Sequence, residues 1–221
     1  MAAQLSRFEP IAGVDGLFTA MKGELRCTAI MLRSGGLCLY SPVAGLSARA
    51  KDSLDDLGKA EFLFAPNHYH NKGLSEYKAA YPTARTVSSE VSRPRLERVT
   101  GLEFQGLEEL SDSLQDGMRL VIPQGLKTGE VWVVIPAGKG IAWLVVDAFA
   151  GGKGTLEEGC EHVRLLGTFP KFGIGNRPQY IEWLDGFLRS GPPEILIPCH
   201  GHIGRGSDLK SQLQNLMAGL R

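Results

Sequence analysis

Short apolar segments separated by glycine-containing turns are the feature that most limits how this chain can fold. Segments such as 61–65, 131–135 and 141–147 are rich in aliphatic and aromatic residues, and 28 glycines are spread between segments of this kind. The longest apolar runs fall far short of the roughly 20 residues that a membrane helix needs. Short strands in runs, with helical segments between them, are typical of α/β and α+β proteins with mixed sheets. We expect one domain, residues 1–221.

Local patterns assign the individual elements. The segment 25–43 predicts two strands that turn at 34–36, and the segments 131–135 and 141–147 predict a hairpin through 136–140. Further strands are predicted at 61–65, 84–88, 118–122 and 194–198. Helices are predicted at 47–59, with Ser47 as N-cap and Gly58 as stop, and at 74–80, 156–166, 177–190 and 207–220.

The balance of charges and the spacing of the cysteines argue against several classes of protein. Lys+Arg and Asp+Glu both number 24, so no overall basic field favours nucleic acid or an anionic membrane. The four cysteines are widely spaced and form no CxxC pair, which argues against a zinc ribbon or a disulfide framework. The first residues show no secretory pattern, so a cytoplasmic location is expected. A small-molecule substrate is the expected partner, without nucleic acid or membrane.

Four of the five histidines form two His-x-His pairs, and each pair directly follows a predicted buried strand. The pairs are His68 with His70 and His200 with His202. In an extended segment, residues i and i+2 point to the same side, so each pair can present two imidazoles to one point. Strand ends are also where α/β proteins gather ligands. The pattern favours a metal site, and the alternative is that the histidines lie in surface loops.

The segment 68-HYHNK-72 begins a series of features in a familiar order. Asp147 ends a predicted strand, and His200 follows a later strand. This order resembles the metallo-β-lactamase superfamily, with its HxHxDH motif, a third histidine in a GHTPG-like turn, a strand-end aspartate and a late histidine. The resemblance covers about residues 25–205, with His68 and His70 matching the first two histidines. It implies a four-layer αββα sandwich with two mixed sheets.

Several positions depart from the family pattern. Asn71 and Lys72 stand where the motif has Asp and His, and Leu126, in 125-GLKTG-129, stands where the third histidine belongs. The sequence is therefore similar to a metallo-hydrolase-like branch with a degenerate metal motif. In the intact family two metal ions hold a bridging hydroxide. A protonated Lys72 among the ligands repels a second ion, so two ions are not expected.

The resemblance implies a reduced, single-metal site. His68, His70, Asp147 and His200 are the expected ligands, of types that suit one zinc, or iron or manganese. A metal-bound water would attack an ester, thioester or similar small molecule, with Asp147 holding or deprotonating it and His200 as ligand or proton carrier. Lys72 is the third expected catalytic residue, because its ammonium can replace the charge of the lost ion and polarise the substrate.

Two alternatives stay open at this level. Lys72 can instead form a salt bridge with Asp147 that stabilises an empty pocket. The whole chain can also be a catalytically inactive relative that binds a ligand or a protein without metal. The sequence leaves the oligomeric state open, with a homodimer as one option, and it does not identify a substrate.

Overall fold

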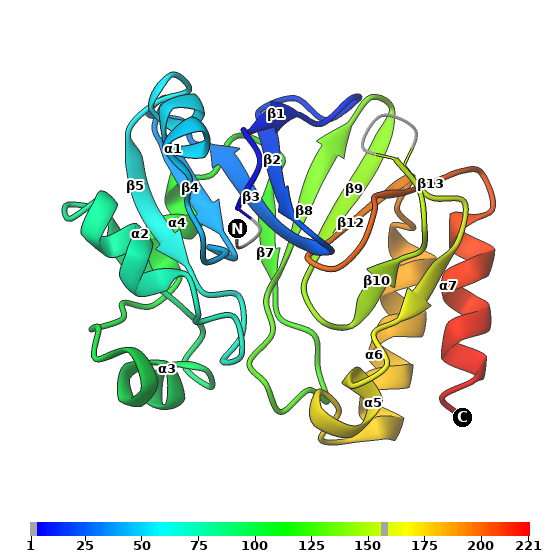
Figure 1. Ribbon diagram of the computed structural model, residues 1–221. Coiled ribbons are helices and arrows are strands. Elements are labelled where there is room, and N and C mark those ends of the chain that lie inside the picture. Colours follow the sequence, from blue (N-terminus) through cyan, green and yellow to red (C-terminus); the bar gives the residue numbers. More distant parts are fainter. Residues whose placement is uncertain (1–3, 156–158) are drawn as a thin grey trace. The chain divides into compact units, whose positions relative to one another are not determined.

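The computed structural model describes residues 4–155 and 159–221 and has a mixed α+β fold with two large sheets. Contacts divide it into two compact units, Met1–Gly117 and Met118–Arg221 (Figure 1). A single domain over 1–221 stays a prediction. No helix of the described residues combines the length and the apolar character needed to cross a membrane.

The first unit is built on a six-stranded sheet in the order β1-β2-β3-β4-β5-β6. Its strands are β1 (Glu9–Pro10), β2 (Leu17–Lys22), β3 (Leu25–Met31), β4 (Leu37–Tyr40), β5 (Ala60–Phe64) and β6 (Arg85–Val87). Its helices are α1 (Ala48–Asp55), α2 (Leu74–Ala80), α3 (Arg93–Thr100) and α4 (Glu108–Ser113). The pairs β4–β5 and β5–β6 are parallel, so the segments that leave these three strands begin at the same edge of the sheet.

Local sequence accounts for the elements that flank this sheet. Ser47 caps α1, since its Oγ accepts a hydrogen bond from the Ala50 amide at 3.0 Å. The helix stops at Asp55, and Gly58 then adopts φ +153°, where a Cβ would lie 2.6 Å from the Gly35 carbonyl oxygen. The predicted helix start and the predicted turn at 34–36 are both confirmed.

The core of the first unit joins the helices to the sheet. Leu54 of α1, Tyr77 of α2 and Leu96 of α3 are at most 1% exposed and belong to one apolar cluster with strand residues such as Leu39 and Leu63. Burying each large apolar side chain stabilises the fold by about 1.5–3 kcal/mol. This packing holds the sheet edge at which β4, β5 and β6 end.

The second unit contains a five-stranded sheet in the order β13-β12-β9-β8-β7 and a two-stranded sheet of β10 and β11. Its strands are β7 (Arg119–Val121), β8 (Trp132–Ala137), β9 (Gly140–Val145), β10 (Phe149–Gly151), β11 (Val163–Leu165), β12 (Ile195–Pro198) and β13 (Gly204–Arg205). Its helices are α5 (Phe169–Phe172), α6 (Arg177–Ser190) and α7 (Leu209–Ala218). Strand β9 pairs antiparallel with β8 and parallel with β12.

The predicted hairpin is confirmed, but its turn is tighter than expected. Pro136 and Ala137 belong to β8, and Ala137 pairs with Gly140. The turn is therefore reduced to Gly138 and Lys139, and Gly138 adopts φ +58°. A two-residue turn of this kind matches the twist of the two strands.

Aromatic side chains fasten α6 to the five-stranded sheet. The rings of Trp143 and Phe187 stack with centroids 4.6 Å apart, and Trp183 stacks on Phe187 at 4.9 Å. Trp132 lies edge-on to Trp183 at 5.4 Å. In Figure 1, α7 runs beside α6, in agreement with the contacts between the two helices.

The predicted helix at 156–166 is wrong where the structure describes it. Residues 163–165 form β11, which pairs antiparallel with β10. His162 lies before that strand, and its carbonyl accepts a hydrogen bond from the Gly152 amide at 2.9 Å. Pairing with β10 satisfies the backbone of this segment and overrides its helical pattern. Residues 156–158 of the predicted helix lie outside the described residues.

The four cysteines should resist thiol reagents in the folded protein. All four are free thiols and buried, and burial raises the pKa of Cys27 to about 12. Because the thiolate is the reactive form, labelling with a maleimide followed by mass spectrometry should detect almost no adduct in the native protein. The same protein unfolded in guanidinium chloride should take up four labels, and rapid native labelling of Cys27 would contradict the described core.

Candidate functional site

The segment after β5 forms a turn that Asn67 organises. Asn67 is fully buried, and its Oδ1 accepts hydrogen bonds from the amides of Tyr69 at 2.8 Å and His70 at 3.1 Å. These hydrogen bonds hold residues 67–70 in a turn, so His68 and His70 do not lie in the extended segment that was expected for them. The rings of His68 and Tyr69 are nearly perpendicular, with centroids 4.3 Å apart. The two imidazoles therefore have different neighbours.

Ser41 holds His70. Parallel pairing places the end of β4 beside the end of β5, and the Ser41 Oγ lies 2.6 Å from His70 Nδ1. Ser41 is 1% exposed, and among the described residues it is the one non-glycine residue with positive φ, at +57°. Such a backbone is costly, so surrounding contacts must maintain it. No sequence motif pointed to Ser41.

Lys72 lies in the turn that precedes α2 and is exposed. The following residue, Gly73, packs so closely on the loop after β4 that a Cβ there would lie 2.3 Å from the Pro42 carbonyl oxygen. The Asn71 side-chain amide donates to the His68 carbonyl oxygen at 3.1 Å. The predicted catalytic role of Lys72 stays a prediction.

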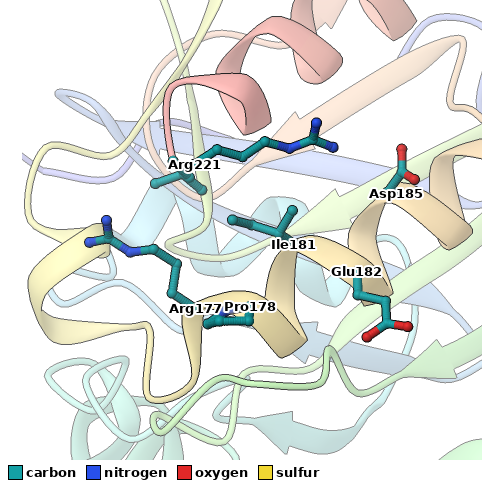
Figure 2. A pocket seen from close by; sticks show the side chains of 7 residues that line it. Arg177, Pro178, Ile181, Glu182, Asp185 and Arg221 are labelled. Carbon is teal, nitrogen blue, oxygen red and sulfur yellow. The ribbon is translucent and has the colours of Figure 1, made fainter.

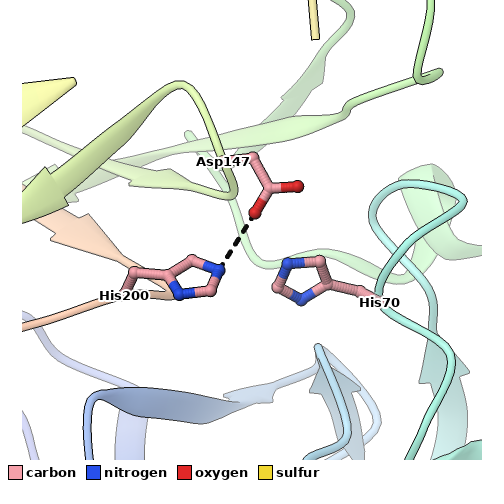
Figure 3. A group of neighbouring side chains, drawn as sticks. All are labelled: His70, Asp147 and His200. Atoms are coloured by element: carbon pink, nitrogen blue, oxygen red, sulfur yellow. Dashed lines mark hydrogen bonds and ion pairs between the residues drawn. The ribbon is translucent and has the colours of Figure 1, made fainter. Parts of the chain in front are cut away.

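In the second unit, two predicted site residues come together. Asp147 follows β9 and His200 follows β12, and the parallel register pairs Val145 with Pro198. The Cys199 amide then donates to the Val145 carbonyl at 3.0 Å, which extends the pairing to the residue before His200. Asp147 Oδ1 lies 3.0 Å from His200 Nε2, the contact drawn in Figure 3. The two side chains are 13% and 20% exposed.

Gly201, next to His200, packs closely against Gly151 of β10. Gly201 has φ +80°, and a Cβ there would lie 2.3 Å from the Gly151 carbonyl oxygen. The Gly151 amide donates to the His200 carbonyl oxygen at 2.8 Å, so β10 lies directly against this segment. The left-handed residue between His200 and His202 removes the extended geometry expected for this second pair.

Glu130 is a buried acid beside Asp147, and it is not among the site residues that the sequence predicts. It is 1% exposed, and burial, followed by the charge of Asp147, raises its pKa to about 7. Its carboxylate accepts hydrogen bonds from Trp132 Nε1 at 2.7 Å, the Ala148 amide at 3.2 Å and the Asp147 amide at 3.3 Å. The hairpin register could have revealed it, since it lies opposite Asp147.

A surface groove of about 460 Å³ lies elsewhere on the second unit. Figure 2 shows it between α6 and the last residues of the described chain. Its lining consists of Arg177, Pro178, Ile181, Glu182, Asp185, Leu220 and Arg221. None of these is a predicted site residue, and the lining carries both signs of charge. The groove is therefore separate from the residues that the sequence predicts for the site.

Comparison with solved structures identifies the fold. The structure matches the DIM-1 metallo-β-lactamase exposed to ceftazidime over 100% of both chains, with a TM-score of 0.64 and 16% identity. It matches a metallo-β-lactamase from Hirschia baltica over 97% of this chain and 98% of that one, with a TM-score of 0.63 and 14% identity. The chain has the metallo-β-lactamase fold.

The fold also occurs within a larger protein. A flavodiiron core, Flv1 from Synechocystis sp. PCC6803, matches all of this chain with a TM-score of 0.63 and 14% identity, and the chain spans 62% of its length. No family model matches the sequence. No curated protein matches it either.

Replacing Ser41 should separate its hydrogen bond from its backbone strain. Ser41→Ala removes the contact with His70 and keeps a side chain at positive φ, so it should lower the free energy of unfolding by about 1–3 kcal/mol. Ser41→Gly also loses the contact but relaxes the backbone, so its loss should be smaller. Urea unfolding measures both, and a glycine variant less stable than the alanine variant would contradict this account.

Proposed function

We propose that this chain is a metallo-hydrolase-like protein with a single metal ion. The sequence predicts His68, His70, Asp147 and His200 as ligands, and we propose that His70, Asp147 and His200 form the set, with His68 as a fourth candidate. They offer imidazole nitrogens and one carboxylate oxygen, which suit zinc, iron or manganese. The observation that carries the proposal is the pairing of Asp147 with His200 at the ends of two adjacent parallel strands.

The geometry of that pair fits a shared ion. Two ligand atoms bound to one tetrahedral zinc at about 2.0–2.1 Å lie roughly 3.3 Å apart. Asp147 Oδ1 and His200 Nε2 are 3.0 Å apart, so a small outward movement would let both atoms bind the same ion. Both side chains are mostly buried, which restricts their rotamers and lowers the entropy lost on binding.

The contact of His70 with Ser41 supports its assignment as a ligand. A metal-bound histidine usually donates its second ring nitrogen to a neighbouring oxygen, which fixes the ring and its tautomer. Ser41 Oγ at 2.6 Å from Nδ1 supplies such an oxygen, and the tautomer that donates from Nδ1 presents the Nε2 lone pair to a metal.

Three residues favour one ion over two. Leu126 stands at the position of the family's third histidine and has no ligand atom, and its backbone bridges to Ile174. The Asn71 amide nitrogen donates to a carbonyl, and Lys72 carries a positive charge. A cation next to the metal site raises the energy of a second bound cation.

In the proposed hydrolysis, the metal ion and the side chains would have different roles. When bound, the ion would supply Lewis acidity, which polarises a carbonyl or phosphoryl oxygen and lowers the pKa of a water. Asp147 would accept or hold a proton at its carboxylate, and His200 would carry a proton or serve as ligand. Lys72 would orient and polarise an ester or thioester substrate.

Metal content tests this proposal directly. We expect close to one equivalent of metal by elemental analysis, both in protein purified without added metal and in protein reconstituted with zinc, iron or manganese. His70→Ala and His200→Ala should each bind far less, because each removes a ligand. His162→Ala is the matched control, since His162 is an exposed histidine outside the ligand set. The result for His68→Ala decides whether His68 is a ligand.

A protein without metal after reconstitution would contradict the proposal. It would favour the alternative of an inactive relative that uses the fold to bind a ligand or another protein. Two equivalents in the wild type would contradict the single-ion arrangement.

Lys72 should contribute to turnover without contributing to metal binding. Lys72→Met should keep one equivalent of zinc and slow the hydrolysis of p-nitrophenyl esters by about 10²-fold, the effect of removing one electrostatic stabiliser. Lys59→Met, an exposed lysine of the same unit, is the matched control and should keep the wild-type rate. An unchanged rate in Lys72→Met would show that its ammonium has no catalytic role.

A further inference from the structure

The hairpin of β8 and β9 places a buried acid opposite the strand-end aspartate. Val133 pairs with Leu144, and counting three residues back along β8 and three forward along β9 reaches Glu130 and Asp147. Both residues lie just beyond the paired strands. In an antiparallel pair, opposed residues are close enough for their side chains and backbone groups to interact.

Glu130 satisfies the backbone where β9 ends. The strand ladder stops at Val145, and the amides of Asp147 and Ala148 turn to the Glu130 carboxylate, at 3.3 Å and 3.2 Å. Ala148 is buried, so its amide would otherwise lack a partner. The indole of Trp132 donates to the same carboxylate at 2.7 Å and anchors it from the β8 side.

We propose that Glu130 is a positioning residue that fixes the Asp147 backbone, so that the Asp147 carboxylate is held beside His200 for metal binding. The inference rests on the proposed single-metal function. Glu130 is 1% exposed and acts through Asp147, whose Oδ1 meets His200 Nε2 at 3.0 Å. Neighbours that orient metal ligands in this way have a large effect on metal affinity.

The role requires a carboxylate. Three donors converge on Glu130: two backbone amides and one indole. A carboxylate accepts at both oxygens, whereas a glutamine offers one oxygen and one NH₂ group that only donates. In Glu130→Gln, the NH₂ group must therefore face at least one of the three donors, and the hydrogen bond to that donor is lost. The isosteric change leaves the shape of the core intact while it replaces one of the two acceptor oxygens by a donor.

The test measures zinc affinity in three variants that keep every candidate ligand. Glu130→Gln should raise the Kd for zinc by about 10- to 100-fold, as measured by competition with a chromophoric chelator. Glu130→Asp keeps the charge but shortens the reach to the amides, and it should fall between the wild type and Glu130→Gln. Circular dichroism of each variant establishes that it is folded before its affinity is measured.

Leu213→Ala is the matched control for general destabilisation. It removes buried side-chain volume from α7 and leaves Glu130 and its three donors unchanged, so it should lower thermal stability while keeping near-wild-type zinc affinity. If Glu130→Gln binds zinc as tightly as the wild type, the inference is overturned. It is also overturned if both variants lose affinity in proportion to their loss of stability.

A measurement on metal-free protein separates this inference from the proposed function. Hydrogen exchange followed by NMR should show protected amides at Asp147 and Ala148 in the wild type. In Glu130→Gln, exchange should be faster at whichever of the two amides faces the NH₂ group. If the wild type binds no metal, the proposed function is contradicted. The exchange rates of the two amides still test whether Glu130 fixes the Asp147 backbone. Unchanged protection in Glu130→Gln would refute that role even if zinc binds.

Discussion

The hydrogen-bonded register of β9 is the constraint on which the second unit depends. This strand pairs antiparallel with β8 and parallel with β12, so its end is set from both sides. One partner brings Glu130 opposite Asp147, and the other brings His200 to the same sheet edge. A slip of one residue in either pairing would turn the side chains to the opposite face. The geometry of the acid and the imidazole thus follows from backbone pairing, and the aromatic packing of α6 stabilises the sheet that maintains it.

The first unit positions His70 by a similar arrangement. The parallel pair β4 and β5 brings Ser41 beside the turn that carries His70. Asn67 holds that turn through its buried side chain, and the positive φ of Ser41 adds local strain. Strain of this kind persists when surrounding structure enforces it, and it is common at functional sites. In both units, a buried side chain accepts hydrogen bonds from the backbone just beyond a strand: Asn67 in the first unit and Glu130 in the second.

Much of the fold could be predicted because it is encoded in short segments. The helices at 74–80 and 177–190 begin and end where predicted, and the hairpin of β8 and β9 was recognised from two apolar runs and the glycines between them. The metallo-β-lactamase fold, inferred from the order of motifs, is confirmed by solved structures of low sequence identity. The helix predicted at 156–166 failed because pairing with β10 outweighed its local pattern.

Local patterns in the sequence were enough to predict the helix cap at Ser47, the fold, and Asp147 and His200 as candidate metal ligands. They did not determine how those ligands are held, because these contacts join residues far apart in the chain. Asp147 and His200 are separated by 53 positions, and Ser41 and His70 by 29. Tertiary structure also replaced the expected extended geometry of the histidine pairs, since a buried asparagine and a left-handed glycine bend the backbone. Strand register and the need to satisfy buried polar groups made these choices, and both are properties of the folded chain.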